Sequence, residues 1–193
     1  QCRLGIPRHL RRHQGKVQVV RIVALAVDAA VAPAQGREGR LVGRDGVDVG
    51  GHGFPVPADA QDLHVMQTSR RVETFVTVGA PTTDALQPSN EGIELVALTH
   101  PNDLYATETA TFQLLIDGEP AAGAEIEVVR GGMRYRNSQA AITVNADAQG
   151  QFEITWPEAG MYFMEAAYRD DQAKAPATVR TGSYAATFEV LPL

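Results

Sequence analysis

From Val72 to the C-terminus, short segments of alternating apolar and polar residues follow one another along the chain. This two-residue period is typical of β-strands that bury one face. Turn residues such as Asp117-Gly118 separate the segments. The spacing predicts about eight strands, as in a sandwich or barrel. We place them at residues 72–78, 93–99, 109–116, 124–129, 141–145, 152–156, 161–168 and 183–191.

Two of these segments also predict which residues face the interior. In residues 124–129, Ile126 and Val128 fall on one face, and Glu125 and Glu127 fall on the other. In residues 152–156, the pattern places Trp156 on the buried face. Pro and Gly recur too often for long helices. We therefore predict an all-β protein with an immunoglobulin-like or transthyretin-like β-sandwich and a poorly structured N-terminal arm.

The first 53 residues have a different composition from the rest of the chain. Residues 1–53 carry nine basic and four acidic residues, a net charge of +5, and residues 54–193 carry a net charge of -11. Every aromatic residue lies at or after Phe54, and no Ser, Thr or Asn precedes Thr68. A core needs large apolar side chains. We therefore expect an atypical basic arm at 1–53, a linker or edge segment at 54–70, and the β-sandwich domain at 71–193.

Three interpretations of the arm remain open. It is a basic segment that binds an anionic surface, or a secretion signal with its apolar region at 17–32. Arg21 and Asp28 interrupt that apolar region. The third interpretation is that residues 1–53 are not native, because a GC-rich gene translated in the wrong frame gives this composition. We favour the third, and it predicts a disordered or loosely packed arm.

The composition of the whole chain excludes several kinds of protein. One Cys in 193 residues excludes an intrachain disulfide and a cysteine-based zinc or iron–sulfur site. No apolar run approaches the roughly 20 residues of a membrane-spanning helix. A net charge of -6 argues against binding to nucleic acid. These counts are typical of one globular domain with an appendage.

Three runs of residues carry a resemblance to a known family. They are Arg71-Val-Glu-Thr-Phe-Val-Thr-Val-Gly-Ala-Pro81, Glu94-Leu-Val-Ala-Leu-Thr-His-Pro-Asn-Asp-Leu104, and Gly132-Met-Arg-Tyr-Arg136 with Trp156-Pro-Glu-Ala-Gly-Met-Tyr162. Together they resemble the domain-of-unknown-function 4198 family over residues 57–193. Its members are often described as the periplasmic component of cobalt or nickel transport. They usually begin with a signal peptide and a first β-rich half, which residues 1–53 do not resemble.

The resemblance implies a non-enzymatic periplasmic accessory protein linked to nickel or cobalt uptake. A membrane transporter component is then the implied partner, and a nickel or cobalt ion is the implied ligand. Imidazole nitrogen with carboxylate oxygen suits these ions. His100 and Asp103 lie in one loop and are the candidate metal ligands. The alternative is structural: Asp103 bonds to backbone in a turn, and His100 caps that turn.

A second loop is the best candidate for recognising a ligand or partner. Arg134, Tyr135 and Arg136 follow two glycines and form a basic, aromatic tip on an acidic domain. They favour an alternative function, a carbohydrate- or protein-binding extracytoplasmic module. The structural alternative is a solvated hairpin tip. The serines lie outside any nucleophile-elbow pattern, and Glu125 and Glu127 fit a solvated strand face better than a glycosidase pair. We therefore predict no enzymatic activity.

Overall fold

The computed structural model of the chain describes residues 19–33, 63–77 and 79–193. In these residues the secondary structure consists of strands, apart from two short 3-10 helices, η1 (Asp84–Leu86) and η2 (Met133–Tyr135). The strands form two sheets that pack in a sandwich-like arrangement. This confirms the predicted all-β sandwich. The finer immunoglobulin-like or transthyretin-like assignment stays a prediction.

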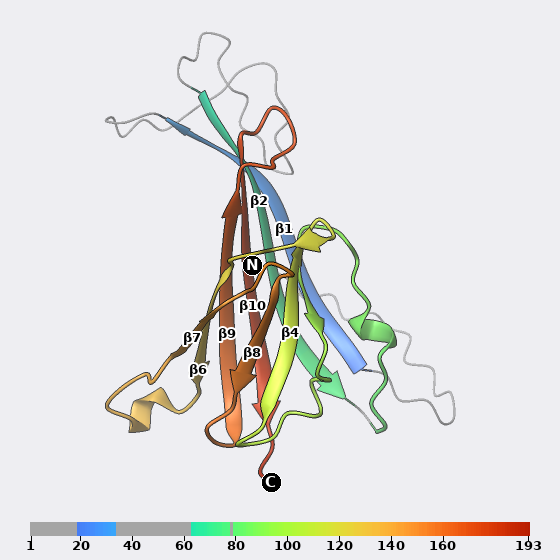
Figure 1. Cartoon of the computed structure of the whole chain (residues 1–193), viewed down its shortest axis with the longest axis vertical. Coiled ribbons are helices and arrows are strands. Elements are labelled where there is room, and N and C mark those ends of the chain that lie inside the picture. Colours follow the sequence, from blue (N-terminus) through green and yellow to red (C-terminus); the bar gives the residue numbers. More distant parts are fainter. Residues whose placement is uncertain (1–18, 34–62, 78) are drawn as a thin grey trace, which may run out of the picture.

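The larger sheet has six strands, and residues far apart in the sequence form its centre (Figure 1). β10 lies between β2, to which it runs parallel, and β9, to which it runs antiparallel. All other neighbours in this sheet are antiparallel. In spatial order the strands are β1 (Val19–Pro33), β2 (Leu63–Thr77), β10 (Val179–Val190), β9 (Gly160–Asp170), β6 (Glu125–Arg130) and β7 (Ile142–Asn145).

The smaller sheet is built around β4 (Thr109–Ile116). β4 pairs antiparallel with β3 (Ile93–Ala97), β5 (Glu119–Pro120) and β8 (Gln151–Thr155). In Figure 1, β4 and β8 cross in front of the six-stranded sheet. The two layers therefore enclose one continuous core.

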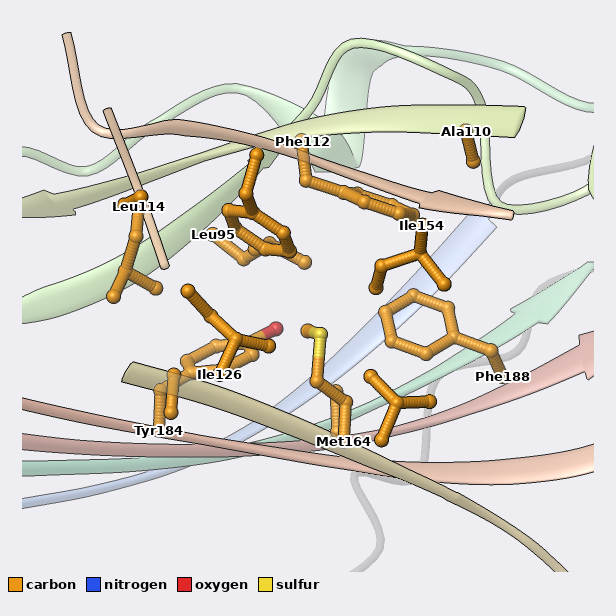
Figure 2. Close-up of a cluster of buried hydrophobic side chains, with 14 of the residues drawn as sticks. Leu95, Ala110, Phe112, Leu114, Ile126, Ile154, Met164, Tyr184 and Phe188 are labelled. Atoms are coloured by element: carbon orange, nitrogen blue, oxygen red, sulfur yellow. The ribbon is translucent and has the colours of Figure 1, made fainter. Parts of the chain in front are cut away.

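Side chains from both sheets meet in that core, as Figure 2 shows. The rings of Phe112 on β4 and Phe188 on β10 lie 5.5 Å apart between centroids and connect the layers. Trp156 is fully buried, as its phase in the sequence predicted, and contacts Tyr162 edge to face. Burying each such large apolar side chain contributes about 1.5–3 kcal/mol. The core is thus the main source of stability for the sandwich.

Each of the eight predicted strands is present. β4 has the predicted bounds, and the other seven strands differ from the prediction only at their ends. Ile126 and Val128 are buried while Glu125 and Glu127 are exposed, which confirms the predicted faces of β6.

Within residues 1–53, predicted as a poorly structured arm, the structure describes one strand, β1. β1, at residues 19–33, pairs with β2 over its whole length, from Val19 opposite Thr77 to Pro33 opposite Leu63. Six of the fifteen residues of β1 are Val or Ile, which favour strands. β1 also pairs with an edge of β2 that would otherwise be exposed. Charges at Arg21 and Asp28 interrupt a secretion signal but are compatible with a strand.

The segment predicted as a linker or edge segment, residues 54–70, also contains sheet structure. β2 begins at Leu63 and lies between β1 and β10, so residues 63–70 belong to an inner strand. The remainder of the arm and linker, residues 1–18 and 34–62, lies outside the described residues. The three interpretations of the origin of the arm are not tested and stay predictions.

Candidate binding site

The connection between β6 and β7 is the loop that the sequence marked as a recognition candidate. Gly132 begins η2 with a φ of 79°, a conformation that residues with a Cβ rarely adopt. The amide of Tyr135 then donates to the carbonyl oxygen of Gly132 at 3.0 Å. The two glycines therefore allow the chain to leave β6 and form one tight helical turn.

The three predicted residues of this loop have different roles. The guanidinium of Arg136 donates to the carbonyl oxygens of Arg130 and Gln139, so it holds the two ends of the loop together. Tyr135 is 85% exposed, and Arg134 is exposed beside it. Arg136 is thus a structural residue of the loop, and Arg134 and Tyr135 form its accessible tip.

A second arginine fixes this loop to the neighbouring turn between β8 and β9. Arg130 donates from Nε and Nη2 to the carbonyl oxygen of Ala159 at 3.1 and 2.8 Å. Its Nη1 lies 2.5 Å from Oε2 of Glu158. A Cβ at Gly160 would lie 3.1 Å from Nε of Arg130, so a glycine is needed for this close approach. The hydrogen-bonding nitrogens of Arg130 are all engaged in these contacts.

A pocket of about 430 Å³ opens beside the loop on the outer face of the six-stranded sheet. Its floor is made by β6, β9 and β10, and its rim by the loop. Arg134 and Tyr135 lie next to the pocket rather than in its lining. The lining residues are Glu127, Val129, Arg130, Gly131, Met133, Gln139, Met161, Tyr162, Phe163, Glu165 and Thr187.

Exposed apolar side chains gather on this face. Met161 is 54% exposed and Phe163 is 45% exposed, and Met133 is accessible at the rim. Val72 and Val76, on β2 of the same sheet, alternate with buried residues and are exposed as well. Large apolar patches of this kind usually mark binding surfaces. The outer face of the sheet is therefore the candidate interaction surface of the described chain.

Two carboxylates lie side by side in the floor of the pocket. Glu127 on β6 is directly opposite Glu165 on β9 in the antiparallel ladder. Cβ atoms of such pairs are about 4.5–5.5 Å apart, and like charges at this position are destabilising. Within the described residues, neither carboxylate has a hydrogen bond or ion pair. The pocket therefore combines apolar side chains with two carboxylates, Glu127 and Glu165, that have no cationic partner among the described residues.

The predicted metal ligands occupy a turn in which the histidine ring is already hydrogen-bonded. Nδ1 of His100 accepts the amide proton of Asn102 at 3.1 Å, and Nε2 lies 3.2 Å from the carbonyl oxygen of Thr82. Because a carbonyl only accepts, Nε2 carries the proton. Asp103 is exposed, and its amide donates to the carbonyl oxygen of His100. The ring of His100 thus takes part in the turn, and metal binding by His100 and Asp103 stays a prediction.

The described residues contain no cluster of three or more His, Cys, Asp or Glu side chains that could hold a metal ion. Likewise, no helix in the described part of the chain has the length and apolar character needed to cross a membrane.

A buried charged cluster, which the sequence analysis did not identify, connects the two sheets. Arg71 on β2 donates to Glu94 on β3 at 2.9 Å, and both side chains are almost completely buried. Glu94 also accepts hydrogen bonds from the amides of Ser89 and Asn90. Burial alone would raise the pKa of Glu94, but the hydrogen bonds from Ser89, Arg71 and Asn90 lower it below its ordinary value. Glu94 is therefore held as a carboxylate.

The same cluster extends into the core through Glu73. Nε of Arg71 lies 3.7 Å from Oε1 of Glu73, and the hydroxyl of Tyr184 donates to Oε2 of Glu73 at 2.6 Å. Signals for the cluster are present in the sequence, because Arg71 and Glu73 are in phase with Phe75. A charged residue in phase with a buried face predicts a buried ion pair.

A second cluster of ion pairs lies around Arg180, which is opposite Gln67 of β2. The guanidinium of Arg180 binds Asp170 at 2.5 Å and Asp117 at 3.1 Å. Burial opposes ionisation of Asp170, but hydrogen bonds from Arg180, Gln172 and Tyr168 lower its pKa. Burial and the bond to Asp170 raise the pKa of Tyr168. These contacts fix the β9–β10 hairpin to the β4–β5 turn.

Sequence reasoning missed most of the pocket. Residues 161–168 are strongly apolar and were predicted only as a strand, but Met161 and Phe163 are on its exposed face. Glu165, in phase with both, was the available signal that this face is accessible.

Comparisons with known proteins identify one family. Residues 15–170 match the family described as Domain of unknown function (DUF4198). The match begins well before residue 57, where the resemblance was expected to start, and it includes β1. No curated protein and no solved structure matches the chain. Since the match covers most of its residues, the chain belongs to the DUF4198 family of unknown function.

Proposed function

We propose that this protein is a non-enzymatic binding module that recognises a segment of a partner protein in the pocket beside the β6–β7 loop. The observation that carries the proposal is the pocket itself, in which exposed apolar side chains lie beside an exposed loop tip. Met161 and Phe163 provide apolar surface that a partner would remove from water, and this is the main source of binding free energy at such sites.

A protein segment fits the pocket better than a carbohydrate. Sugars stack on aromatic faces and need several polar groups in fixed positions. The flexible apolar side chains of Met133 and Met161 lie in the lining together with Val129, and methionine is common at surfaces that bind peptides. Tyr135, with 85% exposure beside the pocket, is suited to cover a bound segment.

The family resemblance suggests a cellular location and a partner for this binding module. We propose that the protein acts in the periplasm and that its partner is a membrane component of nickel or cobalt transport. In this proposal the partner segment, and not an ion, is the ligand of the pocket. The accessory role then requires no metal site in the sandwich.

Site-specific photocrosslinking in cells tests the proposal. A photoreactive phenylalanine replaces Tyr135 beside the pocket, or the control residue Leu98, which is 51% exposed and directly follows β3 of the smaller sheet. We expect a discrete crosslinked species from position 135 that disappears with Phe163→Asp and persists with a metal chelator. The same crosslinking pattern from both positions, or a pattern insensitive to Phe163→Asp, would contradict the proposal.

A further inference from the structure

We infer that the segment bound in this pocket carries a lysine or arginine side chain, which Glu127 and Glu165 bind together. The inference rests on the proposed function and names the chemistry of the partner. It starts from the position of the two carboxylates, which face each other across neighbouring strands within one pocket. A cation placed between them removes their repulsion and gains attraction from both.

Among the described residues, those that line the pocket do not supply that cation. Arg130 is the one basic residue in the lining, and its guanidinium is bound to Glu158 and Ala159. Arg136 is bound to carbonyl oxygens of its own loop. Charge complementarity therefore points to a positive group on the partner.

The apolar residues of the pocket provide a surface for the aliphatic part of a lysine or arginine side chain. Lysine and arginine have aliphatic stems that lie along apolar surface while the charged group reaches polar partners. Val129 and Phe163 stand next to the two carboxylates on the same strands, and they are opposite one another in the ladder. The aromatic ring of Phe163 also attracts a cation that approaches its face.

The occupant is more than an isolated cation. Beyond the pocket, Val72 and Val76 on β2 are further exposed apolar residues on this face of the sheet. A free amine would leave these residues exposed, whereas a polypeptide segment with apolar residues beside its basic one covers them. The pattern thus favours a protein segment that combines a basic side chain with apolar neighbours.

Titration followed by amide NMR spectra of the full chain tests the inference. The probes are an acetylated and amidated valine–lysine–valine tripeptide, its norleucine counterpart, and n-butylamine. We expect the lysine tripeptide to shift the amides of Val129, Phe163 and Glu165 saturably, and to bind about tenfold more tightly than either other probe. Glu127→Gln with Glu165→Gln removes this preference. Glu125→Gln, an exposed change on the same strand but outside this pocket, leaves it intact.

Three results would overturn the inference, and they leave the proposed function distinguishable from it. Equal binding of the norleucine and lysine tripeptides excludes charge recognition, and equal binding of n-butylamine excludes a protein segment. An unchanged preference in the double Gln variant excludes the two carboxylates. If the crosslink from position 135 persists in any of these cases, the proposed function stands without the inference. If the crosslink and the amide shifts are both absent, both proposals fail.

Discussion

The guanidinium of Arg71 and the carboxylate of Glu94 lie 2.9 Å apart in the interior, where they join the two sheets of the sandwich. Each residue belongs to a different run of the sequence that carries the family resemblance. Their side chains are almost completely buried, and amides of the loop before β3 complete the hydrogen bonds of Glu94. The pair therefore fixes how this loop and β3 pack against β2.

We expect Arg71→Met to destabilise the fold by about 3–5 kcal/mol, because it leaves Glu94 buried without its countercharge. Urea unfolding measures the change. The matched control is Arg70→Met on the exposed face of β2, for which we expect a change within about 0.5 kcal/mol. Similar losses in the two variants would show that the buried pair contributes little.

Stability should fall in acid as Glu94 and Asp170 take up protons. Their pKa values are lowered in the folded state, so the unfolded chain binds these protons at higher pH than the folded one. Their contribution is present above the ordinary values of 4.5 and 3.8 and is lost as pH falls through the folded values. We expect the urea midpoint to decrease as the pH is lowered from neutral to about 3.

Variants of these residues identify the groups responsible for that pH dependence. Glu94→Gln and Asp170→Asn should each make the urea midpoint less dependent on pH below about 5. Glu125→Gln, a change at an exposed carboxylate, should leave the dependence as it is. An unaltered pH profile for Glu94→Gln would rule out the buried carboxylate as a contributor.

Two glycines with similar backbone conformations allow a test of close packing. Gly150 and Gly123 have φ values of 72° and 77°, so alanine is strained at both. A Cβ at Gly150 would lie 2.5 Å from the carbonyl oxygen of Leu114, whereas a Cβ at Gly123 meets nothing within 4 Å. We expect Gly123→Ala to cost about 1–2 kcal/mol, and Gly150→Ala to cost clearly more. Equal costs in thermal unfolding would show that the β4 backbone shifts freely.

A substitution of His100 distinguishes a structural role of this residue from a role as a metal ligand. His100→Ala removes hydrogen bonds to Thr82 and Asn102, so we expect a loss of about 1 kcal/mol in stability. Native mass spectrometry with nickel and cobalt should give the same result for the variant and the unchanged chain. One stoichiometric ion that is lost in His100→Ala would instead support the metal site at His100 and Asp103.

The strands of the sandwich could be predicted because their alternation is a local property of the sequence. β4 and the two faces of β6 follow directly from residues 109–116 and 124–129. β1 could not be predicted in this way. Its composition predicted little core, but a strand at a sheet edge is stabilised by pairing with a partner, in this case β2.

The candidate site depends on contacts between distant residues, and for that reason little of it could be predicted. The sequence identified the loop at 134–136 but not that Arg136 would be used to close it. The sequence predicted that Glu127 is a solvated carboxylate on a strand face. It did not predict that Glu165 lies opposite Glu127, because only the pairing of β6 with β9 places it there. The register of a sheet, which sets such pairs, is not a local property of the chain.

The position of β10 has a consequence for the order of folding. Of the described strands it comes last in the chain, yet it alone joins the β1–β2 hairpin to β9 and the strands beyond. Contacts between β2 and β10 close loops of more than 100 residues, as the Thr74–Thr187 bond with a separation of 113 shows. During synthesis, β2 can therefore pair with β10 only after β10 has left the ribosome. The six-stranded sheet is completed late, and such long-range closure predicts slow folding.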